Sequence, residues 1–313
     1  MSMAKPILVT GAHRSGSTWV GRMLAHAPCV AYIHEPFSVS DPPSRGVCNT
    51  RFKYWFTYIS DENEHLYLKP LKRMLELRYD LAGALRGVRS VREFESTISE
   101  FRRFLGYRIK RYTPLVKDPI AFFSAAWMSK KLGMSVVMLI RHPAAFVSSL
   151  KKLNWQHPFS HFVDQKLLME KMLGPFESEI RAYAERKTEI IDQAILLWRM
   201  IHHTVLEYKK THSDWIFVRH EDLSLDPVRE FRILCGKLGL QFSSSTEDAI
   251  QNYSGPLNPQ DPDAPVGSED TLKRDSRMNI RNWKNRLSLN EIERIRTKVE
   301  DISRFFYSDS DWK

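Results

Sequence analysis

The sequence contains little cysteine and no long hydrophobic run. Its three cysteines, Cys29, Cys48 and Cys235, are too few and too scattered for a disulfide framework or a zinc site. No stretch approaches the roughly 20 consecutive apolar residues that a membrane-spanning helix requires. The N-terminus lacks a charged segment followed by an apolar one, so we expect no secretory signal. These absences predict a protein of a reducing compartment, the cytoplasm, without a membrane span.

The composition is that of a folded chain with an excess of positive charge. Hydrophobic residues make up 42% and charged residues 27% of the 313 residues, which excludes a disordered chain. Lysine and arginine outnumber aspartate and glutamate by 47 to 37, a formal net charge of +10. This excess indicates an anionic partner, but it does not distinguish a nucleic acid from a membrane or a phosphorylated ligand.

Short apolar runs alternate with longer helical patterns along the chain. Such runs, without polar alternation, are typical of central strands in a parallel sheet that is covered on both faces. Strands that alternate with helices predict an α/β fold of three layers with a central, mainly parallel sheet. The expected strands are residues 7–10, 29–33, 115–116, 136–140 and 215–218. The expected helices include residues 18–27, 121–132 and 176–210, and the four prolines of residues 254–268 predict a surface loop.

A glycine-rich segment joins the first expected strand to the first helix. Residues 10–19 read TGAHRSGSTW, in which Gly11 and Gly16 give the frame G-x-x-x-x-G-x-T of a phosphate-binding loop. The two glycines let successive backbone N–H groups converge on an anion at a helix N-terminus. A nucleotide-hydrolysing loop carries a lysine after its second glycine, but Ser17 stands there and Arg14 precedes the glycine instead. The segment therefore predicts a phosphate site that lacks the main β/γ-phosphate ligand of a kinase.

A second phosphate site is indicated at the end of the 136–140 strand. The strand is followed by Arg141, and Pro143 suits the first turn of the next helix. An arginine at the carboxyl end of a parallel strand lies at the rim where open α/β sheets bind ligands. Ser149, two turns into that helix, is expected to face the same crevice, with Ser148 as the neighbour that could be confused with it.

The two motifs together resemble a known family. The letters RSGSTW resemble the 5′-phosphosulfate loop of the sulfotransferases that use 3′-phosphoadenosine 5′-phosphosulfate (PAPS). The cytosolic branch has P-K-S-G-T-T-W there, so Arg14 takes the place of its lysine, as in many carbohydrate-type and bacterial members. Arg141 and Ser149 resemble the family's 3′-phosphate element. The resemblance implies a P-loop-NTPase-like fold, PAPS as co-substrate, 3′-phosphoadenosine 5′-phosphate (PAP) as product, and no metal requirement.

The resemblance also implies which residues bind the nucleotide. They are His13, Arg14, Ser15, Gly16, Ser17, Thr18, Trp19, Arg141, Ser149, His220, Arg277 and Arg281. Trp19 either stacks on the adenine or packs in the core. His220 stands where the family's Y-E-D-L segment has tyrosine, and the following Glu221 is expected to orient the loop. Arg277 and Arg281 lie in a basic C-terminal loop of roughly residues 268–288. We expect one domain over residues 1–313, with a basic helical insertion at roughly 50–111.

The base that accepts the acceptor's proton is predicted from a departure from the cytosolic branch. That branch has a K-T-H segment, whereas this chain has Lys117, Asp118 and Pro119, so the histidine is missing. Glu35, in the segment YIHEPF, resembles the Y-E-P carboxylate of carbohydrate-type members. We predict Glu35 as the general base, with Lys117 and Arg14 stabilising developing charge, and His34 and Asp118 as alternatives.

Other functions and partners remain as alternatives. A Mg²⁺ requirement would favour a P-loop kinase, and salt-sensitive polymer binding would favour a non-enzymatic polyanion-binding protein. Nucleic acid is not expected, because the basic–aromatic platform of single-strand binders is absent. The resemblance implies an acceptor that is a small molecule or a carbohydrate with a hydroxyl or amine. The net charge of +7 over residues 69–111 makes an anionic acceptor one option.

Four histidines are expected at the surface or in the acceptor pocket rather than on a metal. They are His157, His161, His202 and His203.

Overall fold

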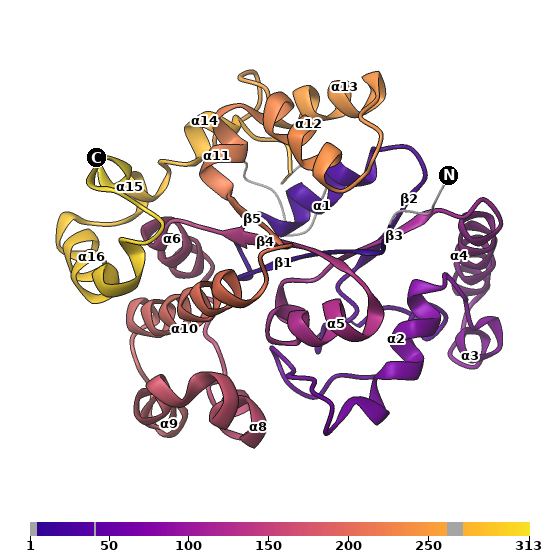
Figure 1. Cartoon of the computed structure of the whole chain (residues 1–313), viewed down its shortest axis with the longest axis horizontal. Coiled ribbons are helices and arrows are strands. Elements are labelled where there is room, and N and C mark those ends of the chain that lie inside the picture. The colour runs from indigo at the N-terminus through magenta and orange to yellow at the C-terminus, as the bar shows by residue number, and fades with distance from the viewer. Residues whose placement is uncertain (1–4, 41, 262–271) are drawn as a thin grey trace.

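Five parallel strands form the centre of the computed structural model, which describes residues 5–40, 42–261 and 272–313 (Figure 1). They lie in the order β2-β3-β1-β4-β5, and each neighbouring pair runs parallel. The strands are β1 (Ile7–Gly11), β2 (Val30–His34), β3 (Thr113–Lys117), β4 (Ser135–Ile140) and β5 (Ile216–Arg219). All their carboxyl ends therefore meet at one edge of the sheet.

Helices cover both faces of this sheet. Those between β1 and β4 are α1 (Ser17–Ala25), α2 (Leu68–Leu75), α3 (Leu81–Leu85), α4 (Val91–Ile109) and α5 (Ala125–Leu132). Those between β4 and β5 are α6 (Pro143–Leu153), α7 (Ser160–Val163), α8 (Lys166–Leu168), α9 (Glu177–Glu185) and α10 (Ile190–Thr211). After β5 come α11 (His220–Leu225), α12 (Pro227–Lys237), α13 (Ser244–Ser254), α14 (Ser276–Asn279), α15 (Trp283–Arg286) and α16 (Leu289–Ser303).

The strands are buried on both sides because alternate side chains enter two separate cores. Ile7 and Val9 of β1 pack in the core under α1, α12 and α13. Leu8, between them, packs in the core of α5, α6 and α10 on the opposite face. Figure 1 shows these two groups of helices on opposite sides of the sheet. The predicted three-layer α/β fold with a parallel central sheet is thus confirmed.

Two of the predicted helices differ from the structure. The single helix expected over 176–210 is two helices, α9 and α10, because Arg186 is extended after α9. Each helix then packs on a different partner, α9 on α7 and α10 on α6. The helix expected over 121–132 begins only at Ala125. Before it, Asp118 accepts the backbone N–H of Ile120 and holds residues 119–124 in a tighter 3₁₀ turn.

The connection between β2 and β3 contains the basic stretch. In Figure 1, α3 and α4 lie on the side of the N-terminus, whereas α6, α14 and α15 lie on the opposite side. The expected loop at 254–268 begins with the last residue of α13. Residues 262–268 of that loop, and 268–271 of the expected C-terminal basic loop, lie outside the described residues.

Three general features complete the fold. All three cysteines are free thiols. Among the residues that the structure describes, no helix has the length and apolar character needed to cross a membrane. Within the same residues, no group of three or more His, Cys, Asp or Glu side chains is arranged to hold a metal ion.

Candidate functional site

The candidate site lies at the carboxyl ends of three adjacent strands. Gly11 ends β1, and it is flanked by Lys117 at the end of β3 and Ile140 at the end of β4. The chain leaves β1 toward β2 on one side and later returns to β4 on the other. Such a switch in strand order opens a crevice at the carboxyl edge of an α/β sheet, where ligands bind.

The loop between β1 and α1 has the conformation that its glycines permit. Gly11 has φ +149° and Gly16 has φ +89°. A Cβ atom on Gly11 would lie 2.6 Å from the carbonyl oxygen of Leu139, and one on Gly16 would lie 2.3 Å from His220 Cδ2. Arg14 between them also has a left-handed backbone, with φ 63°. The loop therefore turns tightly against β4 and α11 and presents its N–H groups at the start of α1.

Replacing Gly16 by alanine should damage this loop. The left-handed backbone costs a non-glycine residue about 1–2 kcal/mol, and the new methyl group overlaps the His220 ring. We expect a lower Tm and weaker binding of PAP. Gly236, inside α12, is the matched control, because a Cβ there meets nothing within 4 Å. Gly236→Ala should leave Tm unchanged or raise it, and equal effects of the two substitutions would contradict the account.

Two arginines and a serine from three elements meet beside the loop. Arg14 Nε donates to Ser149 Oγ at 3.1 Å, and Arg141 Nη1 donates to the carbonyl oxygen of Arg14 at 2.8 Å. We call Arg14, Arg141 and Ser149 the arginine–serine cluster. The neighbouring Ser148 donates instead to the carbonyl oxygen of Ala145 in its own helix. The structure therefore brings together Arg14, Arg141 and Ser149, which lie up to 135 residues apart in the sequence.

Some buried polar atoms in and beside the cluster have no hydrogen-bond partner among the described residues. Within the described residues, Arg141 Nε and Ser15 Oγ are buried without a hydrogen-bond partner. Burial and the positive charges of Arg274 and Arg286 lower the pKa of Arg14 to about 10. Burial likewise lowers the pKa of Arg141 to about 10, although the Glu221 carboxylate opposes this shift. Both guanidinium groups stay charged near neutral pH, so the crevice favours an anion that accepts several hydrogen bonds.

A layer of buried side chains fixes the backbone around Arg141. Trp198 Nε1 of α10 donates to the Arg141 carbonyl oxygen at 2.9 Å. The next residue, His142, donates its N–H to Glu221 Oε1 at 3.0 Å, and Glu221 Oε2 accepts the Tyr307 hydroxyl at 3.0 Å. Glu221 thus orients the end of β4. The backbone at Arg141 and His142 is thus fixed by contacts from α10 and α11, and Tyr307, after α16, supports Glu221.

A second group of charged side chains lies at the ends of β2 and β3. The Lys117 ammonium is fully buried and pairs with the Glu35 carboxylate, whose side chain is 30% exposed. The Glu35 N–H donates to the Lys117 carbonyl oxygen at 2.8 Å, which holds the two residues side by side. Burial lowers the pKa of Lys117, and the Glu35 charge opposes that shift. The Glu35 carboxylate is therefore partly exposed and forms an ion pair with a buried ammonium group.

The two alternative bases have other contacts. His34 Nδ1 lies 3.1 Å from the Tyr32 hydroxyl on the exposed side of β2. Asp118 is fully buried, and its two oxygens accept the N–H groups of Phe37 at 2.7 Å and Ile120 at 3.0 Å. Asp118 thus clamps the segment after Glu35 to the end of β3, and it does not face an open surface.

Asp118 should make stability depend on pH. Burial, together with the Glu35 charge, raises the pKa of Asp118 from 3.8 to about 7. The folded chain therefore keeps this proton up to about pH 7, whereas the unfolded chain loses it near pH 4. The stabilisation from Asp118 is complete below the unfolded pKa and is lost as pH rises through 7, by up to about 4 kcal/mol.

Urea denaturation between about pH 4 and pH 8 measures this contribution. The free energy of unfolding should decrease with pH more steeply in the native protein than in Asp118→Asn, which cannot titrate there. An identical slope for the two proteins would contradict the raised pKa.

The remaining residues expected at the nucleotide lie in more apolar surroundings. The His13 ring is buried against Phe146 and Trp155, with centroid distances of 5.5 and 5.2 Å, and burial lowers its pKa to about 3. Trp19 packs edge-on against Phe231 at 5.1 Å, and beside His220 at 5.7 Å. The indole of Trp19 is thus part of the core, and the neutral His220 ring covers the loop at Gly16.

The arginines of the C-terminal basic stretch lie in different surroundings. Arg277 Nε donates to the Leu225 carbonyl oxygen at 2.8 Å on the exposed side, and Arg281 is exposed. Arg274 and Arg286 are the residues whose charges act on Arg14 and Arg141. Both lie in the net-positive stretch, but the sequence does not show that Asp275 caps α14 and turns Arg277 outward.

The four histidines that were not expected to bind a metal lie in different environments. His202 was expected at the surface or in the acceptor pocket, and this prediction is wrong. The His202 ring is fully buried and stacks on Trp198 at a centroid distance of 4.0 Å. His161 Nδ1 accepts the N–H of Trp55 at 3.0 Å, and His203 lines a surface hollow. The reason for the error is that α10 has two buried sides, one against α6 and one against α16.

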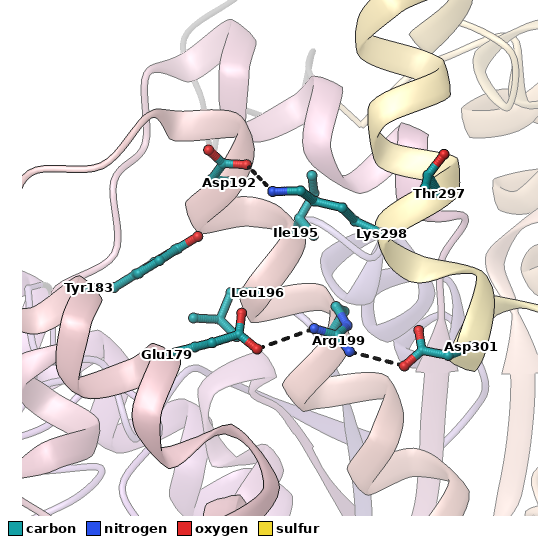
Figure 2. A pocket seen from close by; sticks show the side chains of 9 residues that line it. All are labelled: Glu179, Tyr183, Asp192, Ile195, Leu196, Arg199, Thr297, Lys298 and Asp301. Atoms are coloured by element: carbon teal, nitrogen blue, oxygen red, sulfur yellow. Dashed lines mark hydrogen bonds and ion pairs between the residues drawn. The ribbon is translucent and has the colours of Figure 1, made fainter.

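Two hollows lie away from the crevice, around α10. One, of about 350 Å³, lies between α9, α10 and α16, and the other, of about 620 Å³, shares Arg199 and Asp301 with it. Figure 2 shows Arg199 between Glu179 and Asp301, and Lys298 beside Asp192. These cations already have carboxylate partners. The first hollow therefore offers an anion less than the arginine–serine cluster does.

Comparison with known proteins agrees with the motifs. The model of a family described as the sulfotransferase family matches residues 6–244. No curated protein sequence matches this chain.

Three similar solved structures share low sequence identity with this chain. A sulfotransferase domain from the curacin biosynthetic pathway has 15% identity and a TM-score of 0.48, covering 96% of this chain and 99% of that one. The mouse sulfotransferase SULT7A1, in complex with PAP, has 11% identity and a TM-score of 0.48, with coverage of 99% and 87%. The sulfotransferase STF9 from Mycobacterium avium has 14% identity and a TM-score of 0.45, with coverage of 98% and 78%.

Proposed function

Because the chain belongs to the sulfotransferase family, we propose that it transfers a sulfonate group from PAPS to a hydroxyl or amine of an acceptor, giving PAP and a sulfated product. The observation that carries this proposal is the arginine–serine cluster. Two guanidinium groups, one in the glycine-rich loop and one at the end of β4, lie beside each other at the carboxyl edge of the sheet. A nucleotide with phosphates on both its 5′ and 3′ positions needs two such cationic sites.

The residues of the crevice suit this nucleotide. The loop between Gly11 and Gly16, with Arg14 and the free Ser15 hydroxyl, holds the 5′-phosphosulfate at the start of α1. Arg141 and Ser149 hold the 3′-phosphate, and the unpaired Arg141 Nε supplies a further donor. The positive charges of Arg274 and Arg286 also act on Arg14 and Arg141, although Arg286 is itself paired with Asp261 at 2.7 Å.

Glu35, Lys117 and Arg14 take part in the transfer itself. Glu35 removes the proton from the acceptor hydroxyl as the acceptor oxygen bonds to sulfur and the bond from sulfur to the 5′-phosphate oxygen breaks. Lys117 and Arg14 stabilise the negative charge that develops on the sulfonate and on the leaving phosphate oxygen. These roles are supported by the Glu35–Lys117 ion pair, in which a partly exposed carboxylate contacts a buried cation.

The same residues argue against the two other functions. A kinase of this fold would need a lysine at Ser17 to hold the β- and γ-phosphates. A protein that binds polyanionic polymers would present its cations on an open surface. Here Arg14 and Arg141 are half-buried and fixed by protein contacts.

Transfer of label from sulfur-labelled PAPS to a panel of phenols, hydroxylated lipids and sugars tests the proposal. We expect label in at least one acceptor, with an equal amount of PAP released. Arg232→Ala is a suitable control, because Arg232 pairs with Glu247 away from the crevice. Transfer of phosphorus label from γ-labelled ATP to the acceptor, with no transfer of sulfur label from PAPS, would contradict the proposal.

A further inference from the structure

Helix α4 has an exposed apolar stripe that no described part of the protein covers. The residues recur at helical spacing, so they share one side of the helix. Their exposed fractions are 76% for Val91, 48% for Phe94, 40% for Leu105 and 71% for Ile109. The stripe runs the 19 residues from Val91 to Ile109, and its ends lie about 27 Å apart along the helix. Exposed apolar residues are ordinary when isolated, but several on one side of a helix mark an interaction surface.

A different side of the same helix attaches it to the protein. Phe104 is buried, with its ring 5.7 Å from that of Tyr79, and Phe101 contacts Tyr79 at 6.0 Å. Glu100 accepts the hydroxyl groups of Tyr79 and Ser44 at 2.9 and 2.7 Å. Ser90 caps the first turn by accepting the N–H of Glu93 at 3.2 Å. The helix is thus fixed without the stripe, and the stripe is available to a partner.

Basic residues outnumber acidic residues around the stripe. Residues 86–111 contain eight lysines and arginines and three glutamates, a net charge of +5. Arg102 lies within the stripe, between Phe94 and Leu105, and Arg108 flanks it. Within the described part of the chain, no ion pair involves any of the exposed residues Arg92, Arg102, Arg108, Lys110 and Arg111.

We propose that α4 lies on an anionic membrane surface, with its apolar stripe in the interface and its arginines against the lipid headgroups. Apolar side chains on one side of a helix, flanked by arginines, are the features by which helices bind in the plane of a bilayer. A second copy of the chain fits this surface less well, because a symmetric contact would bring two segments of charge +5 together.

This membrane surface is separate from the nucleotide crevice. Figure 1 shows α4 on the side of the N-terminus, away from α6, which carries Ser149. Nucleotide binding and membrane binding should therefore be altered by different substitutions.

Sedimentation of the full chain with lipid vesicles tests the proposal. We expect binding to vesicles of phosphatidylcholine and phosphatidylserine, no binding to phosphatidylcholine alone, and loss of binding as salt rises. Phe94→Ser with Ile109→Ser should weaken partitioning about 100-fold, at about 10-fold for each large apolar side chain. Arg102→Gln with Arg108→Gln should weaken it about 25-fold, at about 5-fold for each cation.

Matched controls change the same residue types elsewhere. Leu289→Ser removes another exposed apolar side chain, and Lys187→Gln with Lys237→Gln removes two exposed cations. Both controls should bind vesicles normally, and all the variants should bind PAP normally. Absence of vesicle binding by the native chain, or equal binding by the α4 variants, would overturn the proposal. So would a dimer in analytical ultracentrifugation that Phe94→Ser with Ile109→Ser abolishes, because it would show that a second copy covers the stripe.

Discussion

Replacing Arg141 by alanine should weaken PAP binding about 100-fold while adenosine 5′-monophosphate binding changes by less than about 2-fold. The reason is that Arg141 is assigned to the 3′-phosphate, which only PAP carries. A pair of charge-assisted hydrogen bonds to one phosphate contributes about 3 kcal/mol, which corresponds to that loss. Isothermal titration calorimetry with the two nucleotides measures both affinities.

The Arg141 result needs a check that the loop is intact. Arg141 Nη1 also donates to the Arg14 carbonyl oxygen, so alanine removes a contact inside the protein. Arg141→Lys keeps the positive charge without the planar fork, and it should bind PAP with an intermediate affinity. Arg232→Ala should bind PAP normally. If Arg141→Ala weakened both nucleotides equally, Arg141 would support the loop and would not hold a 3′-phosphate.

Replacing Glu35 by glutamine should lower kcat for sulfonate transfer by a factor of about 100 to 10,000 and leave PAP affinity unchanged. Glutamine has the size of glutamate but cannot accept the proton of the acceptor. Because Lys117 pairs with Glu35, the substitution also removes the charge that keeps the pKa of this buried lysine from falling further. Steady-state kinetics with labelled PAPS measures the change in kcat, and calorimetry measures PAP affinity.

A matched substitution distinguishes the general base from an ordinary ion pair. Glu62 pairs with Lys171 at the surface, so Glu62→Gln removes a comparable carboxylate without approaching the crevice. Its kcat should equal that of the native protein. Near-normal turnover in Glu35→Gln, with loss of turnover in His34→Gln, would show that His34 is the base and that our assignment is wrong.

The parts of the site that one segment encodes were predictable from the sequence. The glycine-rich loop is one continuous segment of the sequence, and Gly11 and Gly16 indicate where its backbone turns. Arg141 and Ser149 lie eight residues apart, so the geometry of a strand end and one helix is enough to direct them to the same crevice. The parallel sheet was also predictable from single segments, because each strand is a short apolar run that is followed by its own turn and helix.

The contacts that depend on distant segments were not predictable. Arg274 and Arg286 reach the crevice only because α14 and α15 are placed beside α11 and α6. Trp198 and Tyr307 support the end of β4 from 57 positions away and from the far end of the chain, and neither belongs to a motif. The sequence around Arg186 contains no glycine or proline, so no local signal predicted the break between α9 and α10.

The most direct test of the central claim is calorimetric titration of the native protein with PAP and, separately, with ATP in the presence and absence of Mg²⁺. If the arginine–serine cluster is a site for a nucleotide phosphorylated on both the 5′ and 3′ positions, PAP binds at least about 100-fold more tightly than ATP, and Mg²⁺ does not change this order. Tighter binding of ATP that requires Mg²⁺ would contradict the claim and point to phosphoryl transfer.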